Sequence, residues 1–300
     1  MLIACRLCAR YSSVIPAQDQ YLMKRTLLCA GARRILRKRP LTCVRKSVVP
    51  LKARFLFFLF WFLASAACAL AYLETWVENG GAVRGQVFLR GTLPPPQFLP
   101  VHKNREVCGE QMPDESLQVG PNSEVKNVAV VLEGVRAGKP KPSSLAVLDN
   151  ARCAFVPRVQ TMVVGQELAL RNSDPILHTV HARQHSRGTL FNVGLPVWRR
   201  VQQTLLTPGL MVIDCDVLHT WMRAYIIVTK HPYATVTDAE GRFTLDHVPP
   251  GVYTLSLWHE QLGTQESPIQ LQSDQQISVT LTYRLKERSN LPYQSLAPHP

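Results

Sequence analysis

Apolar and polar residues alternate along several short stretches of this chain. In the stretch 277–283, isoleucine, valine, leucine and tyrosine alternate with serine and threonine. Shorter alternating stretches occur at residues 83–90 and 167–171, and residues 125–132 form a nearly continuous apolar run. A period of two residues is typical of β-strands with one buried face, and no sustained helical period is present after residue 71. We therefore predict an all-β fold.

Turn residues divide these strands into two groups. The sequences Asp238-Ala-Glu-Gly241 and Pro249-Pro250-Gly251 are turn signals within the later group. We place a first β-sandwich at residues 72–230 and a smaller β-domain at residues 231–287. The smaller segment is short for an independent sandwich, so we expect it to pack on the first, with the strand Ala82–Arg90 as a candidate member of its sheet.

The basic charge of the chain is concentrated in its first 71 residues. That leader holds 13 Lys/Arg and one acidic residue, whereas the remaining 229 residues hold 21 Lys/Arg and 20 Asp/Glu. The formal net charge of +13 therefore belongs almost entirely to the leader. A nearly neutral body argues against a nucleic-acid partner.

The leader has the composition of an export signal. Two basic residues precede the apolar run Phe55–Leu63, and small residues follow as far as Ala69-Leu70-Ala71. This order is typical of a secretory signal peptide, which we place at residues 48–71. We expect a periplasmic or otherwise exported protein. Because the apolar run is short for a membrane span, an uncleaved anchor is the alternative and would be its one membrane contact.

The two ends of the chain are expected to lie outside the fold. Residues 1–47 are a basic prefix, either a disordered cytoplasmic segment or the product of a reading frame started too far upstream. Residues 288–300 contain three prolines and no alternation, and we expect a flexible tail there.

Cysteine usage separates three residues from the rest. Five of the eight cysteines lie in the leader, which leaves Cys108, Cys153 and Cys215. An odd cysteine in an oxidising compartment needs an explanation. We predict a disulfide between Cys108 and Cys153, with Cys215 reserved as a metal thiolate.

Cys215 belongs to a candidate metal site. His219 and Met222 follow it closely, and His178 lies 37 residues before it. One thiolate, two imidazoles and a weak thioether are the ligands of a mononuclear type 1 copper site. In the strand before Cys215, Met211 and Ile213 share its face, so the thiol is expected to point inward. The alternative is a buried free cysteine with a core methionine and ordinary histidines.

Two neighbouring residues bear on this site. His181 is an alternative ligand, but three positions along an extended strand would turn it away from His178. Met211 stands four residues before Cys215, where a binuclear copper centre would need a second thiolate. The site is therefore predicted to hold one copper ion.

Motifs of catalysis are missing from the sequence. It contains no His-Glu-x-x-His zinc motif, no glycine-rich phosphate loop and no nucleophile elbow. We expect no enzymatic activity.

The ligand pattern is similar to that of a known family. Asn172-x-Asp174-x3-His178-x-Val180, followed by Cys215, His219 and Met222, resembles the signature of the cupredoxins over residues 80–230. More specifically, the chain resembles exported bacterial plastocyanin-like proteins fused to a carboxypeptidase regulatory-like, transthyretin-type domain. The shared blocks are Cys153-Ala-Phe-Val-Pro157, Phe191-Asn192-Val-Gly, Cys215-Asp-Val, Trp221-Met222, Thr237-Asp…Gly241-x-Phe243, Pro250-Gly251-x-Tyr253 and Trp258-His-Glu260.

The resemblance implies a fold, a cofactor and a function. It implies a Greek-key cupredoxin β-sandwich followed by a small transthyretin-like sandwich, with one type 1 copper. It also implies transfer of single electrons between periplasmic redox partners, without identifying the redox protein. His219, flanked by Leu218 and Trp221, is expected to be the exposed edge through which electrons leave. A copper-binding or copper-buffering protein without a redox role, and a carbohydrate-binding or adhesion β-protein, are the alternatives.

Two positions depart from the family pattern. Thr179 follows the first histidine ligand, where plastocyanin-like sites often have an asparagine that ties the two ligand loops together. Arg158 stands where the nearest relatives often have histidine. Neither departure removes a predicted ligand.

Overall fold

The computed structural model describes residues 72–217 and 219–285. The predictions for residues 1–47, 48–71 and 288–300 lie outside these ranges. Within them, strands dominate and α2 (Arg105–Cys108) is the one helix. None of the described segments forms a helix of the length and apolar character that a bilayer crossing requires. The all-β prediction is confirmed.

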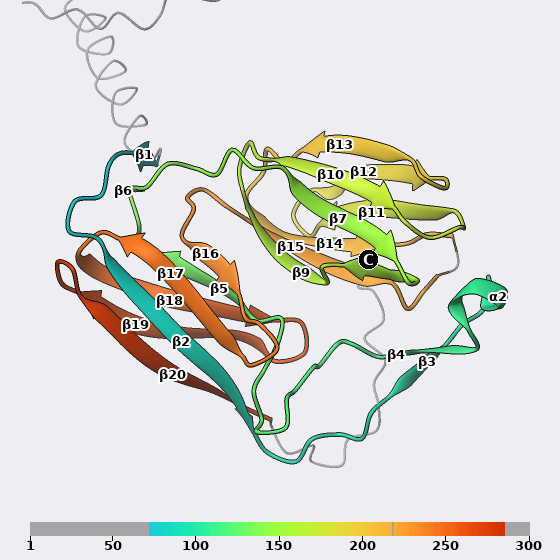
Figure 1. The fold of residues 1–300 in the computed structure, drawn as a ribbon, viewed down its shortest axis with the longest axis horizontal. Helices are drawn as coiled ribbons and strands as arrows, with labels where there is room; N and C mark the ends of the chain where they lie inside the picture. Colours follow the sequence, from blue (N-terminus) through green and yellow to red (C-terminus); the bar gives the residue numbers. More distant parts are fainter. Residues whose placement is uncertain (1–71, 218, 286–300) are drawn as a thin grey trace, which may run out of the picture. The chain divides into compact units, whose positions relative to one another are not determined.

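The first β-sandwich, sandwich A, spans residues 146–229 (Figure 1). Its five-stranded sheet has the order β12-β11-β14-β15-β9, and its four-stranded sheet has the order β13-β10-β7-β8. The pairs β7–β10 and β9–β15 are parallel, and the other pairs are antiparallel. The strands are β7 (Ala146–Ala151), β8 (Ala154–Val156), β9 (Val159–Val163), β10 (Glu167–Asn172), β11 (His178–Gln184), β12 (Gly188–Leu195), β13 (Arg200–Thr204), β14 (Gly209–Asp214) and β15 (Arg223–Thr229).

The core of sandwich A follows from strand alternation. Leu168 and Leu170 of β10 face Val180 and Ala182 of β11 in one buried cluster, because every second residue of each strand points inward. The polar residues between them lie on the outer faces. Burial of such aliphatic side chains is the main favourable contribution to the stability of the sandwich.

The second β-sandwich, sandwich B, has a four-stranded sheet of order β16-β5-β18-β19 and a three-stranded sheet of order β17-β2-β20 (Figure 1). A separate cluster that includes Val83, Leu132, Leu255 and Leu271 forms its core. Its strands are β2 (Gly81–Arg90), β5 (Ala129–Glu133), β16 (Ala234–Val236), β17 (Arg242–Val248), β18 (Gly251–His259), β19 (Gly263–Leu271) and β20 (Gln276–Arg284).

The strand pairings do not divide the chain into one sandwich before residue 230 and another after it. β2 pairs in parallel with β20 and antiparallel with β17, and β5 pairs with β16 and β18. Sandwich B is therefore built from both sides of sandwich A in the sequence, and sandwich A is inserted within it. The physical reason is burial: the later strands alone lack a full partner for their apolar faces, and β2 and β5 supply it.

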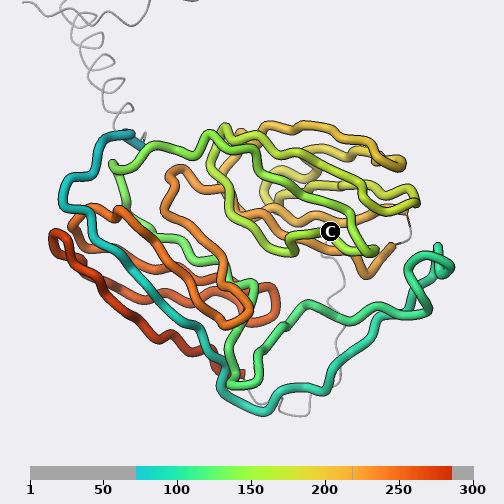
Figure 2. The backbone as a smooth tube through the Cα atoms, viewed as in Figure 1, coloured from blue at the N-terminus to red at the C-terminus, as the bar shows by residue number. Residues whose placement is uncertain are grey.

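The connection between β2 and β5 carries an extended hairpin, visible in Figure 2 as the segment that runs out to α2 and returns. We call residues 98–113 the hairpin arm. In it, β3 (Phe98–Pro100) pairs with β4 (Gln111–Pro113), and α2 lies between them. The arm packs Leu99, Val101 and Met112 against the core of sandwich A. The remaining strands, β1 (Leu73–Glu74) and β6 (Ala137–Gly138), form a short parallel pair.

A disulfide fastens the arm to sandwich A. Cys108 at the end of α2 is bonded to Cys153 in the turn between β7 and β8, with a Cα–Cα distance of 5.7 Å. This is the pairing predicted from the sequence. Among the described cysteines, Cys215 is left free, and it is buried.

Candidate metal centre

The candidate ligands come from two strand ends of the five-stranded sheet. His178 is the first residue of β11, and Cys215 follows the last residue of β14. Met211 and Ile213 point inward from β14, so the same phase turns Cys215 toward the interior, where it is 6% exposed. The loop after Cys215 brings back His219, and a hydrogen bond from the backbone N–H of Met222 to the His219 carbonyl (2.9 Å) tightens that loop.

Three of these side chains converge. The Cys215 Sγ lies 3.9 Å from His178 Nδ1 and 3.6 Å from His219 Nδ1. The two Nδ1 atoms are 3.1 Å apart. All three residues are buried, and they form the one His/Cys/Asp/Glu cluster of metal-binding geometry found among the described residues. The structure thus brings together three of the four predicted ligands.

The proton on the His178 ring can be assigned from its neighbour. His178 Nε2 lies 2.9 Å from the Asp174 carboxylate, which in its ionised form only accepts hydrogen bonds. Nε2 therefore carries the proton, and the Nδ1 lone pair faces the cluster. Burial lowers the pKa of His178, although Asp174 opposes this shift, so the ring is neutral near pH 7.

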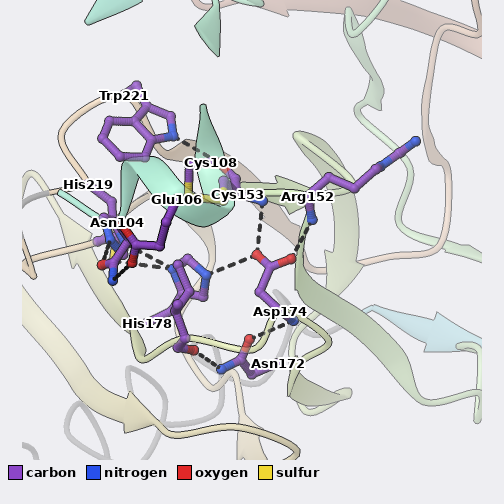
Figure 3. The surroundings of a disulfide bond; sticks show 12 residues. Asn104, Glu106, Cys108, Arg152, Cys153, Asn172, Asp174, His178, His219 and Trp221 are labelled. Atoms are coloured by element: carbon purple, nitrogen blue, oxygen red, sulfur yellow. Dashed lines mark hydrogen bonds and ion pairs between the residues drawn. A yellow bond between two sulfur atoms is a disulfide. The ribbon is translucent and has the colours of Figure 1, made fainter. Parts of the chain in front are cut away.

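Asp174 is itself held by the turn that carries the disulfide (Figure 3). The backbone N–H groups of Arg152 and Cys153 donate to its carboxylate oxygens at 2.6 and 2.9 Å. Both donors have positive φ values (56° each), the conformation of a two-residue hairpin turn, and this directs both N–H groups to one carboxylate. The turn therefore orients His178 through Asp174.

His219 is buried, contrary to the expectation of an exposed edge. It is 0% exposed, and its Nε2 lies 3.0 Å from the side-chain oxygen of Asn104 in the hairpin arm. The Trp221 ring packs 5.1 Å from it, centroid to centroid. Burial, with the positive charge of Lys103 and the nearby His178, lowers the pKa of His219 to about 4. The expectation was wrong because the arm, distant in sequence, covers this imidazole.

Thr179 supplies the link that the family pattern assigns to asparagine. Its backbone N–H and hydroxyl donate to Cys215 Sγ at 3.4 and 3.6 Å. The same hydroxyl oxygen accepts the backbone N–H of Asp216 at 2.7 Å. Thr179 therefore ties the His178 and Cys215 segments together and places two donors on the sulfur.

The other predicted residues lie elsewhere or carry no measured contact to the cluster. His181 points to the outer face of β11, where its nitrogens contact Asp216 (2.9 Å) and the Thr189 hydroxyl (2.8 Å). The structure does not bring it to the cluster. Met222 is buried in the same core as Cys215, and its role as the axial ligand stays a prediction.

The donor set fits a copper ion. The Nδ1 atoms of the two buried imidazoles lie 3.1 Å apart and both face the Cys215 sulfur, so one cation could bind all three atoms. A sulfur and two imidazole nitrogens from a rigid frame are the in-plane ligands of a type 1 copper site. Zinc accepts similar donors but prefers a tetrahedral set.

Asn104 and Thr179 are contributors that the sequence did not reveal in these roles. Asn104 lies 115 positions from His219, and no local pattern connects the two residues. For Thr179, the sequence contained one indication of such a role, namely its position directly after the predicted ligand His178. The contact with sulfur depends on the pairing of β11 with β14, which only the fold defines.

Comparisons with known proteins gave a match to one family model and to several solved structures. Residues 222–285 match the family model of the carboxypeptidase regulatory-like domain. A purple cupredoxin from Nitrosopumilus maritimus is 19% identical over 28% of this chain and 99% of its own, with a TM-score of 0.25. Amicyanin from Paracoccus versutus is 17% identical over 29% of this chain and 84% of its own, with a TM-score of 0.27.

A third solved structure, a copper-containing nitrite reductase from Thermus scotoductus SA-01, is 22% identical over 33% of this chain and 24% of its own, with a TM-score of 0.27. Comparison with curated proteins gave no match. At these TM-scores, the description of sandwich A rests on its own two sheets and on the His178–Cys215–His219 cluster. Sandwich A carries the buried His178–Cys215–His219 cluster at the end of its five-stranded sheet, and residues 222–285 match the carboxypeptidase regulatory-like domain.

Proposed function

We propose that this protein is an exported type 1 copper protein that carries single electrons between redox partners, and that it catalyses no reaction itself. The observation that carries the proposal is the convergence of two neutral imidazole Nδ1 atoms and one buried cysteine sulfur within 3.9 Å. Copper held by these residues would supply a one-electron couple, with Met222 as its proposed axial ligand.

The residues around the cluster favour such a role. Asp174 and Asn104 occupy the outer nitrogens of the two imidazoles and leave Nδ1 for the metal. Thr179 donates to the sulfur and withdraws electron density from it, which tunes the potential. Burial of Cys215 keeps water and oxidants away from the thiolate.

Two observations support export. The leader has the pattern of a signal peptide. Cys108 and Cys153 form a disulfide, which persists in oxidising compartments such as the periplasm. The redox partner is a protein of unidentified type.

Copper storage or buffering is the second candidate function. The burial of His219 under the hairpin arm favours it, because a covered imidazole offers no direct edge for electron exchange. Slow release of a sealed metal would suit a buffer.

Spectroscopy of the mature protein tests the proposal. Cu(II) added to the wild type is expected to produce an intense visible thiolate charge-transfer band, which the Cys215→Ser variant lacks. A colourless wild-type complex would rule out a type 1 site. Voltammetry then separates the two candidates, because a carrier shows a reversible one-electron wave and a buffer does not.

A further inference from the structure

We propose that Asn104, brought by the hairpin arm, is a positioning residue that selects the metal-binding tautomer of His219. The inference rests on the proposed metal centre and assigns a role to a residue outside the ligand-bearing loops. The key contact is the 3.0 Å pair between His219 Nε2 and Asn104 Oδ1.

The orientation of the Asn104 amide is determined by a second contact. Its Nδ2 donates to Glu106 Oε1 at 3.2 Å, and a carboxylate can only accept that bond. The amide oxygen therefore faces His219, in agreement with the 3.0 Å contact between Oδ1 and Nε2. Because this oxygen is an acceptor, Nε2 of His219 must carry the proton and Nδ1 must present its lone pair.

The backbone of Asn104 is suited to this position. Its φ and ψ values are 59° and 40°, a left-handed conformation in which asparagine is several-fold enriched. Its carbonyl accepts the backbone N–H groups of Val107 and Cys108 at 3.0 and 2.9 Å. The residue is thus fixed at the start of α2, four positions before the disulfide.

The Cys108–Cys153 disulfide joins the supports of both imidazoles. On one side, the Cys153 backbone N–H holds Asp174, which orients His178. On the other side, Cys108 anchors the helix that presents Asn104 to His219. The disulfide therefore links the two segments that support the hydrogen bonds to His178 Nε2 and His219 Nε2.

Two substitutions at residue 104 distinguish the effect of the acceptor oxygen from the effect of the backbone conformation. Asn104→Gly removes the amide and retains the left-handed conformation, whereas Asn104→Asp retains an acceptor oxygen. In metal-free protein, nitrogen NMR is expected to show His219 protonated at Nε2 in the wild type and in Asn104→Asp, and a tautomer mixture in Asn104→Gly. In competition with a chelator, Cu(II) is expected to bind Asn104→Gly about 10–100-fold more weakly than wild type.

The possible results have distinct meanings. An unchanged tautomer and unchanged Cu(II) affinity in Asn104→Gly would overturn the inference, as would equal losses in Asn104→Gly and Asn104→Asp. If Asn104→Gly fails to fold, Asn104→Lys provides the comparison, because its side chain offers donors and no acceptor. A wild type that binds no Cu(II) refutes the proposed function instead, and the NMR comparison still decides the role of Asn104.

Discussion

Each residue of the His178–Cys215–His219 cluster has a hydrogen-bond partner outside the cluster. Asp174 receives two backbone N–H groups and one imidazole N–H, so its carboxylate is almost fully occupied. Thr179 acts in the same way on the sulfur. Such outer partners affect metal affinity nearly as strongly as direct ligands do, because they determine which lone pair is available. Single-residue changes should therefore have large effects here.

Asp174→Asn is expected to lower Cu(II) affinity about 10–100-fold. The amide oxygen is a weaker acceptor than a carboxylate and the amide NH2 group is a donor, so the proton is no longer held firmly on His178 Nε2. Chelator competition measures the loss, with Asp246→Asn, an exposed substitution in sandwich B, as the control. Equal affinities in both variants would contradict the role given to Asp174.

Thr179→Val is expected to lower the copper reduction potential by about 40 mV, the equivalent of a hydrogen bond of about 1 kcal/mol. The valine keeps the shape and removes the hydroxyl donor, so the sulfur gives more electron density to oxidised copper. Voltammetry checks this, and Thr179→Ser should stay near wild type. A potential that rises in the valine variant would argue against donation from the hydroxyl.

At the level of elements, the hairpin arm is the part of the structure that covers the metal centre. It pairs only with itself, through β3 and β4, and it is fastened by the disulfide and by apolar contacts to sandwich A. The disulfide joins Cys108 of the arm to Cys153 and so closes a loop of the chain between residues that are 45 positions apart. Loss of the crosslink should therefore affect both stability and access to His219.

The double variant Cys108→Ser/Cys153→Ser is expected to lose about 2–4 kcal/mol of unfolding free energy, because the unfolded chain regains conformational entropy. Urea denaturation measures this loss. The variant should also transfer Cu(I) to a chelator faster than wild type, since the arm is no longer anchored. Unchanged transfer rates would show that apolar packing alone keeps the arm in place.

At the scale of the whole molecule, the two sandwiches share a polar contact. Arg158 donates to both oxygens of the Glu260 carboxylate at 2.6 and 2.9 Å, and the Tyr225 hydroxyl donates to the same group. Tyr225 also packs against Trp258, with ring centroids 4.9 Å apart. The position at which the family pattern has histidine thus joins the two sandwiches in this protein.

Buried His259 should make stability dependent on pH. Burial, with the positive charge of Arg158, lowers the pKa of His259 to about 4. The unfolded chain takes up this proton near pH 6.5, before the folded chain does, so stability falls as the pH drops from about 6.5 toward 4. Between pH 7 and pH 5 this residue should account for about 2 kcal/mol of lost unfolding free energy.

His259→Asn is the matched variant for that measurement. His259 Nδ1 accepts the Gln261 backbone N–H at 3.2 Å, and an asparagine oxygen can replace that acceptor without titrating. Urea denaturation at pH 7 and pH 5 should show a smaller pH effect in the variant. An identical pH effect in both proteins would assign the loss to other buried groups, such as His231.

The sequence alone predicted the class of fold and three residues that the structure brings together as the candidate metal centre. Alternation predicted strands because a two-residue period is a local property of the chain, and 277–283 shows it clearly. Strand phase placed Cys215 inward for the same reason. Cysteine counting predicted the Cys108–Cys153 disulfide, and the order of the candidate ligands predicted that His178 and His219 would lie beside Cys215.

Tertiary structure decided which distant segments meet. The pairing of β2 with β20 and the insertion of sandwich A depend on burial between strands almost two hundred residues apart, which no local period records. His219 is buried beside Asn104, and the disulfide and the apolar contacts of the arm hold Asn104 next to the loop that carries His219. Composition and spacing therefore predicted the candidate ligands because their order is a local property of the chain, whereas long-range packing decided the burial of His219 and its contact with Asn104.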